Sequence, residues 1–220
     1  MTIGCTATAF TPLSGAKPAR KPGVICNWLK NKKVSMFQKI IIAIALIGSG
    51  QALSQPTSPQ YLQLKDRLDR PGDGYCLDVV GSGKHIRLDM PLTAHNCKGP
   101  QVYADEVVQF RSDQSLYFPA YDGCVTAMGL NDKALPGNAL MLKACGVAQP
   151  FLNARKFQRF EFNAQGQVML VGSHLCLTAG GESHTTYSLE HKWRSLFLLT
   201  CAEAELTHSV WNLVPAGYNR

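Results

Sequence analysis

The chain has 220 residues, 45% of them apolar, which is enough for one well-packed domain with appendages. Its formal net charge of +7 comes from the N-terminal quarter: seven Lys and Arg residues precede Gln55, and no Asp or Glu precedes Asp66. From Gln55 onward, the other 15 basic residues balance 15 acidic ones. A neutral body excludes an electrostatic nucleic-acid-binding surface.

The segment that starts at Met36 is typical of a signal peptide. Lys39 lies in a short basic n-region, and Ile40–Ile47 form an eight-residue apolar run. The small residues that follow provide a cleavage site after Ala52 or Ser54. The apolar run is too short to span a bilayer as a helix, which needs ~20 residues. We therefore expect cleavage; a retained membrane anchor or a buried helix is the alternative.

These features divide the chain into two parts. Residues 1–54 are predicted to be a leader with a signal peptide, and translation starts at Met1 or at Met36. Residues 55–220 are predicted to form one domain that is secreted or periplasmic, with no stable membrane anchor after cleavage.

The body contains six cysteines, and an even number in an exported chain favours disulfides over a metal or redox site. The "HNC" at 95–97 is too sparse for zinc. We therefore expect no metal and no cofactor. Six cysteines allow 15 pairings, so the choice rests on the symmetry of the sequence.

Aligned on the cysteines, the body divides into three similar units. The first cysteines of successive units are 48 and 52 residues apart, and the two cysteines within each unit are separated by 21, 21 and 25 residues. The symmetric pairing is one bridge per unit: Cys76 with Cys97, Cys124 with Cys145, and Cys176 with Cys201.

Each unit carries short runs typical of β-strands, such as "LMLKA" and "FLLTC", bounded by turn-forming stretches such as "VGSG" and "ALPGN". Such units predict an all-β barrel of threefold symmetry closed by hairpins, in which the units share one core. Equivalent apolar positions should form the core layers: Leu92, Leu140 and Leu196, and Val108, Phe160 and Trp211.

Three motifs carry a resemblance to a known family. They are the "CLD" at 76–78, the "GNALMLKAC" at 137–145, and the Gln-x-Trp-like triplets "EVV" (106–108), "QRF" (158–160) and "SVW" (209–211). The body resembles the ricin B-type lectin family. The resemblance implies a β-trefoil of three pseudo-repeats, each closed by one disulfide, that binds glycans of the galactose type without catalysis.

The resemblance also implies a sugar site in the first repeat. Sugar recognition needs a carboxylate for hydroxyl groups and an aromatic face beside it. The family's carboxylate falls on Asp78, whereas the other repeats have Thr126 and Thr178 there. The remaining family positions fall on Thr93, on His95 where a stacking aromatic is usual, and on Asp105 where Asn is usual; nearby Tyr103 is a second stacking candidate.

Two alternatives remain open at this stage, and one is excluded. Asp105 beside Asp78 offers two carboxylates, which favours an amino sugar or a bound cation. Asp78 alone could instead cap a turn in a vestigial site. The "GSGKH" at 81–85 lacks the spacing and the Ser or Thr of a phosphate-binding loop, so we exclude that chemistry.

A rival interpretation makes the chain a non-catalytic subunit that delivers or docks a partner toxin or enzyme. The insertion at 180–196 supports it, because this long loop carries His184, Tyr187, His191 and Trp193. An aromatic surface built from Tyr103, Phe151 and Trp193 would favour this rival, whereas a solvated hairpin with Trp193 tucked on the barrel is the plainer expectation for the loop.

Overall fold

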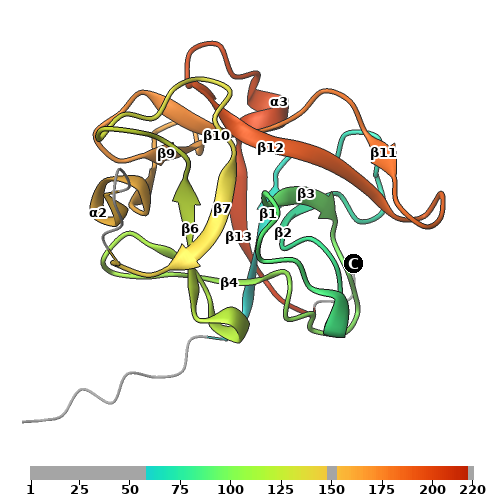
Figure 1. Cartoon of the computed structure of the whole chain (residues 1–220). Helices are drawn as coiled ribbons and strands as arrows, with labels where there is room; N and C mark the ends of the chain where they lie inside the picture. Colours follow the sequence, from blue (N-terminus) through green and yellow to red (C-terminus); the bar gives the residue numbers. More distant parts are fainter. Residues whose placement is uncertain (1–57, 148–152, 218–220) are drawn as a thin grey trace, which may run out of the picture. The chain divides into compact units, whose positions relative to one another are not determined.

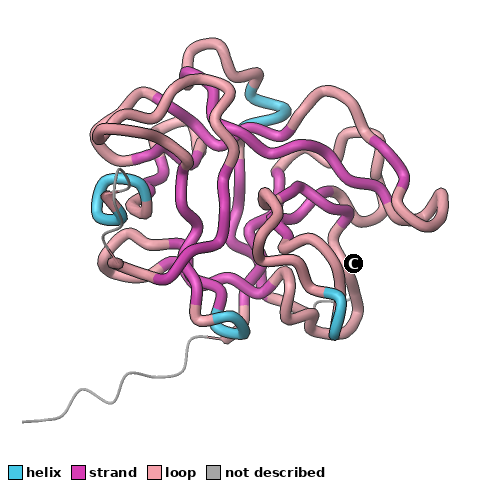
Figure 2. The backbone as a smooth tube through the Cα atoms, in the orientation of Figure 1, coloured by secondary structure: helices cyan, strands magenta, loops and turns pink. Residues whose placement is uncertain are grey.

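The computed structural model describes residues 58–147 and 153–217. The predicted leader and Phe151 therefore lie outside the described residues. Within them the chain forms thirteen strands, and the two α-helices, α2 (Ala154–Phe157) and α3 (Leu206–Ser209), are single turns. Figure 2 shows this dominance of strands and loops. In this part of the chain no helix is long and apolar enough to cross a membrane.

Twelve of the strands fall into three groups of four, one group per predicted repeat. They are β1 (Gln60–Leu64), β2 (Tyr75–Asp78), β3 (Thr93–Asn96) and β4 (Val107–Phe110); β5 (Leu116–Phe118), β6 (Gly123–Ala127), β7 (Leu140–Ala144) and β8 (Phe160–Phe162); and β9 (Val168–Leu170), β10 (Leu175–Ala179), β12 (Lys192–Thr200) and β13 (Trp211–Pro215). The extra strand β11 (His184–Thr185) lies in the insertion of the third repeat and pairs with β12.

The outer strands of each group build the barrel and the inner two form a hairpin. Antiparallel pairing joins β4 to β5, β8 to β9, and β1 to both β13 and β4. The hairpins are β2–β3, β6–β7 and β10–β12, which Figure 1 shows around the central strands. This arrangement is a β-trefoil, so the predicted fold class is confirmed.

The three repeats share one core. All six predicted layer positions are buried, none of them more than 3% exposed: Leu92, Leu140 and Leu196, and Val108, Phe160 and Trp211. The Trp211 indole N–H donates to the carbonyl of Leu177 at 3.0 Å, so the largest core side chain also satisfies its polar atom.

The three disulfides have the predicted pairing, one in each repeat: Cys76–Cys97, Cys124–Cys145 and Cys176–Cys201. Each bridge therefore closes the hairpin of its own repeat. In the chain-entropy model a closed loop of this length stabilises the fold by roughly 3 kcal/mol.

The hairpins of the first and third repeats are joined to each other. Strand β12 pairs with β3 over three residues, with Trp193 opposite His95 and Ser195 opposite Thr93. This pairing carries β11 and the rest of the insertion to the side of the first repeat, as Figure 1 shows. The pairing therefore brings insertion residues such as Trp193 next to His95 of the predicted sugar site, although the two are far apart in the chain.

Truncating a core aromatic should cost far more stability than truncating a surface one. Phe160 is fully buried, whereas Tyr187 is fully exposed. We expect Phe160→Ala to lower the free energy of unfolding by about 3–5 kcal/mol, and Tyr187→Ala to change it by less than about 0.5 kcal/mol. Urea denaturation measures both, and similar losses would contradict the assigned core.

Candidate ligand-binding site

Asp78 is the last residue of β2 and lies opposite Thr93 of β3 in the strand register. Its side chain is buried, with 3% of the residue exposed. One carboxylate oxygen, Oδ2, accepts from the Lys98 ammonium at 3.0 Å, while Oδ1 has no hydrogen-bond partner among the described residues. The turn-capping alternative is therefore wrong, because Asp78 lies in a strand and bonds to a side chain.

Lys98 is the centre of a buried cluster of charges. Its ammonium also donates to Asp105 at 2.5 Å, and its backbone N–H donates to both carboxylate oxygens of Glu106 at 2.9 and 3.1 Å. Asp105 and Glu106 are at most 5% exposed. Three carboxylates thus surround one lysine. The Lys98 ammonium therefore occupies the position of the cation that the two carboxylates Asp78 and Asp105 were expected to attract.

The cluster raises the pKa values of both Asp78 and Lys98, for different reasons. Burial raises the pKa of Asp78 well above its ordinary value; the Lys98 charge opposes this rise, and the charges of Glu106 and Asp105 add to it. Burial alone would lower the pKa of Lys98, but the surrounding carboxylates outweigh it and raise that pKa overall. The lysine is therefore firmly charged.

The other two repeats have no comparable charges at these positions. Thr126 and Thr178 are buried, and each hydroxyl donates to the backbone carbonyl of the cysteine two residues earlier, at 3.0 Å. The residue after the second cysteine is Lys98 in the first repeat but Gly146 and Ala202 in the others. The first repeat alone thus places an ion-pair cluster at this position.

His95 lies beside the cluster on β3. Its Nδ1 is 2.9 Å from the carbonyl oxygen of Asn96 and 3.8 Å from Oδ2 of Asp78. Burial lowers the pKa of His95 to about 4, and the charge on Lys98 adds to this effect. His95 is thus neutral at pH 7, and Nδ1 carries the proton because it faces a carbonyl acceptor.

One group of side chains meets the spacing of a metal site. A carboxylate oxygen of Asp78, one of Glu106 and a ring nitrogen of His95 lie within 4.8 Å of one another. The ammonium of Lys98 already gives Asp78 a cationic partner, and the Nδ1 proton of His95 is directed to a carbonyl. We therefore assign the group to an internal ion pair.

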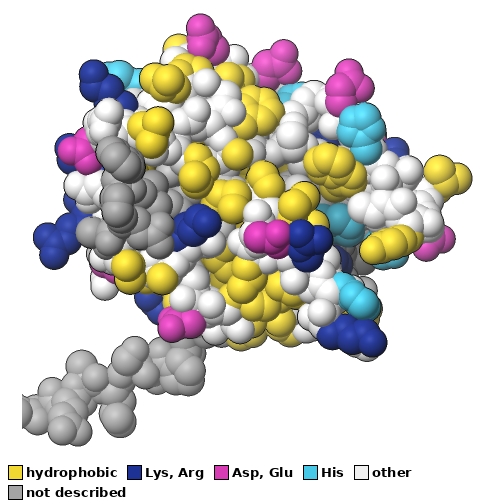
Figure 3. Space-filling view, viewed as in Figure 1, with side chains coloured by type: hydrophobic (Ala, Val, Ile, Leu, Met, Phe, Trp, Pro, Cys, Tyr) yellow, Lys and Arg dark blue, Asp and Glu magenta, His cyan; other side chains and the backbone are white. Residues whose placement is uncertain are grey.

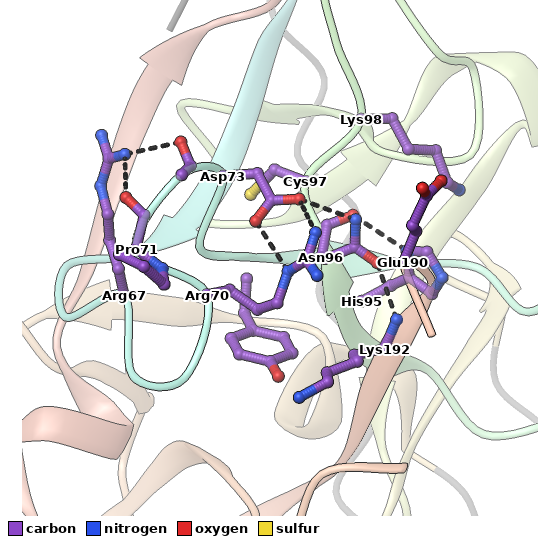
Figure 4. Close-up of polar contacts among 12 residues, drawn as sticks. Arg67, Arg70, Pro71, Asp73, His95, Asn96, Cys97, Lys98, Glu190 and Lys192 are labelled. Carbon is purple, nitrogen blue, oxygen red and sulfur yellow. Dashed lines mark hydrogen bonds and ion pairs between the residues drawn. The ribbon is translucent and has the colours of Figure 1, made fainter. Parts of the chain in front are cut away.

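An open groove adjoins the cluster. It has a volume of about 620 Å³, and Lys98 and Tyr103 line it together with Arg70, Asp73, Glu190 and His191. Figure 4 shows Asp73 and Asn96 side by side, with Lys98 and Glu190 to their right. Of the sequence-predicted residues, Asp78, His95 and Asp105 meet at Lys98, Tyr103 lines the groove, and Thr93 lies opposite Asp78.

Asp69 fastens the third-repeat insertion to the first repeat. Its carboxylate accepts from Lys192 at 2.8 Å, Arg194 at 2.6 Å, Ser183 at 2.8 Å and Tyr75 at 2.7 Å. Burial by itself raises the pKa of Asp69, but these hydrogen bonds outweigh it and hold the pKa far below the usual range. Lys192 and Arg194 thus serve an internal contact.

Sequence reasoning missed Lys98, Glu106 and the groove. A signal for the first two existed, since Lys98 directly follows a repeat cysteine and Glu106 replaces the Gln of the Gln-x-Trp motif. The corresponding Gln158 of the second repeat donates to the Thr126 hydroxyl at 2.8 Å. Aligning the repeats at these two positions would have indicated a charged first repeat.

No protein-family model matches the chain, and no curated protein matches it either. Solved structures similar to it include an agglutinin from Abrus precatorius, at 19% identity and a TM-score of 0.49, covering 76% of this chain and 51% of that one. The chain thus spans about half the length of that agglutinin.

Two further structures are similar to most of this chain. The β-trefoil lectin of the Vibrio vulnificus hemolysin/cytolysin, solved with N-acetyl-D-lactosamine, is 15% identical, with a TM-score of 0.44 and coverage of 76% and 100%. The cytolethal distending toxin from Actinobacillus actinomycetemcomitans is 17% identical, with a TM-score of 0.47 and coverage of 76% and 97%. At such identities a likeness concerns the fold and transfers no function.

Removing the lysine charge should destabilise the domain. In Lys98→Met the carboxylates of Asp78 and Asp105 lose their cation, so we expect a loss of about 3–5 kcal/mol at pH 7. The loss should shrink at pH 4.5, because the raised pKa of Asp78 favours its neutral form there and removes the repulsion between the two carboxylates. The matched control is Lys156→Met, whose ion pair with Asp132 is exposed and should contribute about 0–1 kcal/mol. Equal losses in urea denaturation would exclude the buried cluster.

The low pKa of His95 should make folding sensitive to acid. Between pH 7 and pH 5 an unfolded histidine gains a proton that the folded His95 does not, so stability falls with pH by about 2 kcal/mol. The raised pKa of Asp78 has the opposite effect on stability, but Asp78 is present both in the unaltered protein and in the His95→Gln variant, so its effect cancels in the comparison.

The His95→Gln variant should therefore show a flatter pH profile than the unaltered protein. Urea denaturation at pH 7 and pH 5 measures the difference, with His174→Gln, at an exposed site, as the control. An unchanged profile in His95→Gln would contradict the assigned environment.

Proposed function

We propose that this chain is an exported, non-catalytic carbohydrate-binding module whose one sugar site lies in the first repeat. The observation that carries the proposal is the position of Lys98, which joins the buried carboxylates of that repeat to the open groove. The expectations of a signal peptide and of secretion or periplasmic location belong to the same proposal, and the three disulfides support them.

The site offers the groups that sugar recognition requires. An ammonium has three N–H donors, and Lys98 uses one on Asp78 and one on Asp105 among the described residues, which leaves one for a sugar hydroxyl. Tyr103 adds a ring for the apolar face of a sugar and a hydroxyl at its edge. Asp78 and Asp105 act through Lys98, because they hold its ammonium in place.

The proposed site is also a poor candidate for catalysis. Acid–base hydrolysis needs a carboxylic acid and a carboxylate on opposite sides of the scissile bond. Asp78 and Asp105 are engaged by the Lys98 ammonium, and Glu106 accepts its backbone N–H. This supports binding without turnover.

One observation favours the rival function of docking a partner protein. At the tip of the insertion Tyr187 is fully exposed and Leu189 is 81% exposed. Exposed apolar side chains on a projecting loop are a common basis of protein contacts. Trp193, by contrast, is half-buried against His184, at 5.8 Å between ring centroids.

A binding experiment with three proteins tests the proposal. On a glycan array and on cell surfaces, Tyr103→Ala should reduce sugar retention at least about tenfold through lost stacking, while Tyr187→Ala should retain it. Near-UV circular dichroism checks that both variants are folded. If Tyr187→Ala alone loses cell binding and no glycan is retained by any of the three, the docking function replaces the sugar site.

A further inference from the structure

Resting on the proposed sugar site, we infer that the groove holds two subsites: Lys98 and Tyr103 line the first, and the loop of Arg70 and Asp73 together with the third-repeat insertion builds the second. The second subsite receives the next residue of an oligosaccharide, and it favours amino sugars over acidic sugars. The insertion thus becomes part of the binding surface, and the chain recognises a glycan of at least two residues.

The dimensions and the lining of the groove support this role. Its volume of about 620 Å³ lies within the roughly 300–1,000 Å³ of pockets that bind drug-sized ligands. Its lining residues come from three segments: Arg70 and Asp73 from the loop between β1 and β2, Asn96 and Lys98 from the end of β3 and just after it, and Glu190 and His191 from the insertion.

Hydrogen bonds hold these segments in a fixed relation before a ligand arrives. Arg70 forms two parallel bonds with Asp73, at 2.9 and 2.6 Å. Asn96 donates to Asp73 at 2.9 Å and accepts the backbone N–H of Lys192 at 2.9 Å, as the dashed lines in Figure 4 show. A site that is ordered in advance loses less entropy on binding.

The charges around the groove select against acids. The lining supplies two cations, Arg70 and Lys98, and two carboxylates, Asp73 and Glu190. Three more carboxylates lie beneath Lys98, those of Asp78, Asp105 and Glu106. With these buried acids beneath it, the lining is acidic on balance, which repels a uronic acid and attracts an ammonium group. Elsewhere, the face in Figure 3 shows basic and acidic side chains interspersed.

Glu190 is the carboxylate that a ligand in the groove can reach. It is exposed, and its side chain accepts no hydrogen bond and forms no ion pair among the described residues. Asp73, by contrast, is engaged by Arg70 and Asn96. An amino sugar in the groove would therefore pair with Glu190.

Titration calorimetry at pH 7 with the full domain tests this inference. The probes are glucosamine, a β-1,4-linked glucosamine disaccharide, its N-acetylated counterpart and a glucuronic acid disaccharide. We expect the glucosamine disaccharide to bind about tenfold more tightly than the monosaccharide, and the acidic disaccharide to bind weakest.

Variants on the insertion identify the residue responsible. Glu190→Gln should weaken the binding of the glucosamine disaccharide by about two- to five-fold, which is the contribution of an exposed ion pair. It should leave the affinity for the N-acetylated disaccharide unchanged. Glu182→Gln is the matched control, because Glu182 is an exposed glutamate of the same insertion that does not line the groove.

The outcomes separate the two proposals. Sugar binding that depends on Tyr103 but is equal for monosaccharide and disaccharide overturns the second subsite and leaves the first standing. Equal effects of Glu190→Gln and Glu182→Gln also overturn the role of the insertion. Binding of no sugar by the unaltered protein overturns both.

Discussion

The whole barrel depends on the antiparallel pairing of its first and last strands. Strand β1 pairs with β13 over five residues, from Gln60 opposite Pro215 to Leu64 opposite Trp211. Closure leaves no free edge at this seam and places Trp211 in the common core. The three repeats can then bury their apolar faces only together, because none has enough apolar surface to fold alone.

On this symmetric frame the three repeats differ in their polar residues. In the second repeat Gln158 and Thr126 hydrogen-bond with each other, and in the third repeat Gln167 donates to Ser209 at 2.8 Å. Both are neutral, fully buried networks that stabilise the fold. In the first repeat the same region contains ionised groups beside a groove, an arrangement that costs desolvation energy and is typical of binding sites.

Much of the fold could be predicted from the sequence, because it follows from spacing. The repeated cysteine gaps gave the pairing Cys76–Cys97, and the repeated apolar positions gave core residues such as Phe160. The site could be predicted in part. Asp78, His95 and Asp105 do meet, yet their meeting point, Lys98, follows from side-chain positions that no periodicity encodes.

The groove was harder to predict for the same reason. It depends on β12 pairing with β3 and on Asp69 reaching Arg194, a contact across 125 residues. An insertion in one repeat has no counterpart in the others, so symmetry gives no information about where it packs. Its packing partner follows only from the three-dimensional arrangement of the first and third hairpins.

The fastening of the insertion by Asp69 has a consequence for how the molecule responds to its surroundings. The contacts of Asp69 with Lys192 and Arg194 are charge pairs, and Asp69 and Lys192 are partly exposed to solvent. Salt screens such pairs over about 8 Å at physiological ionic strength. Both sides of the groove include such ion pairs, Arg70 with Asp73 on one side and Lys192 with Asp69 on the other, so high salt would weaken the groove before it affected the fold.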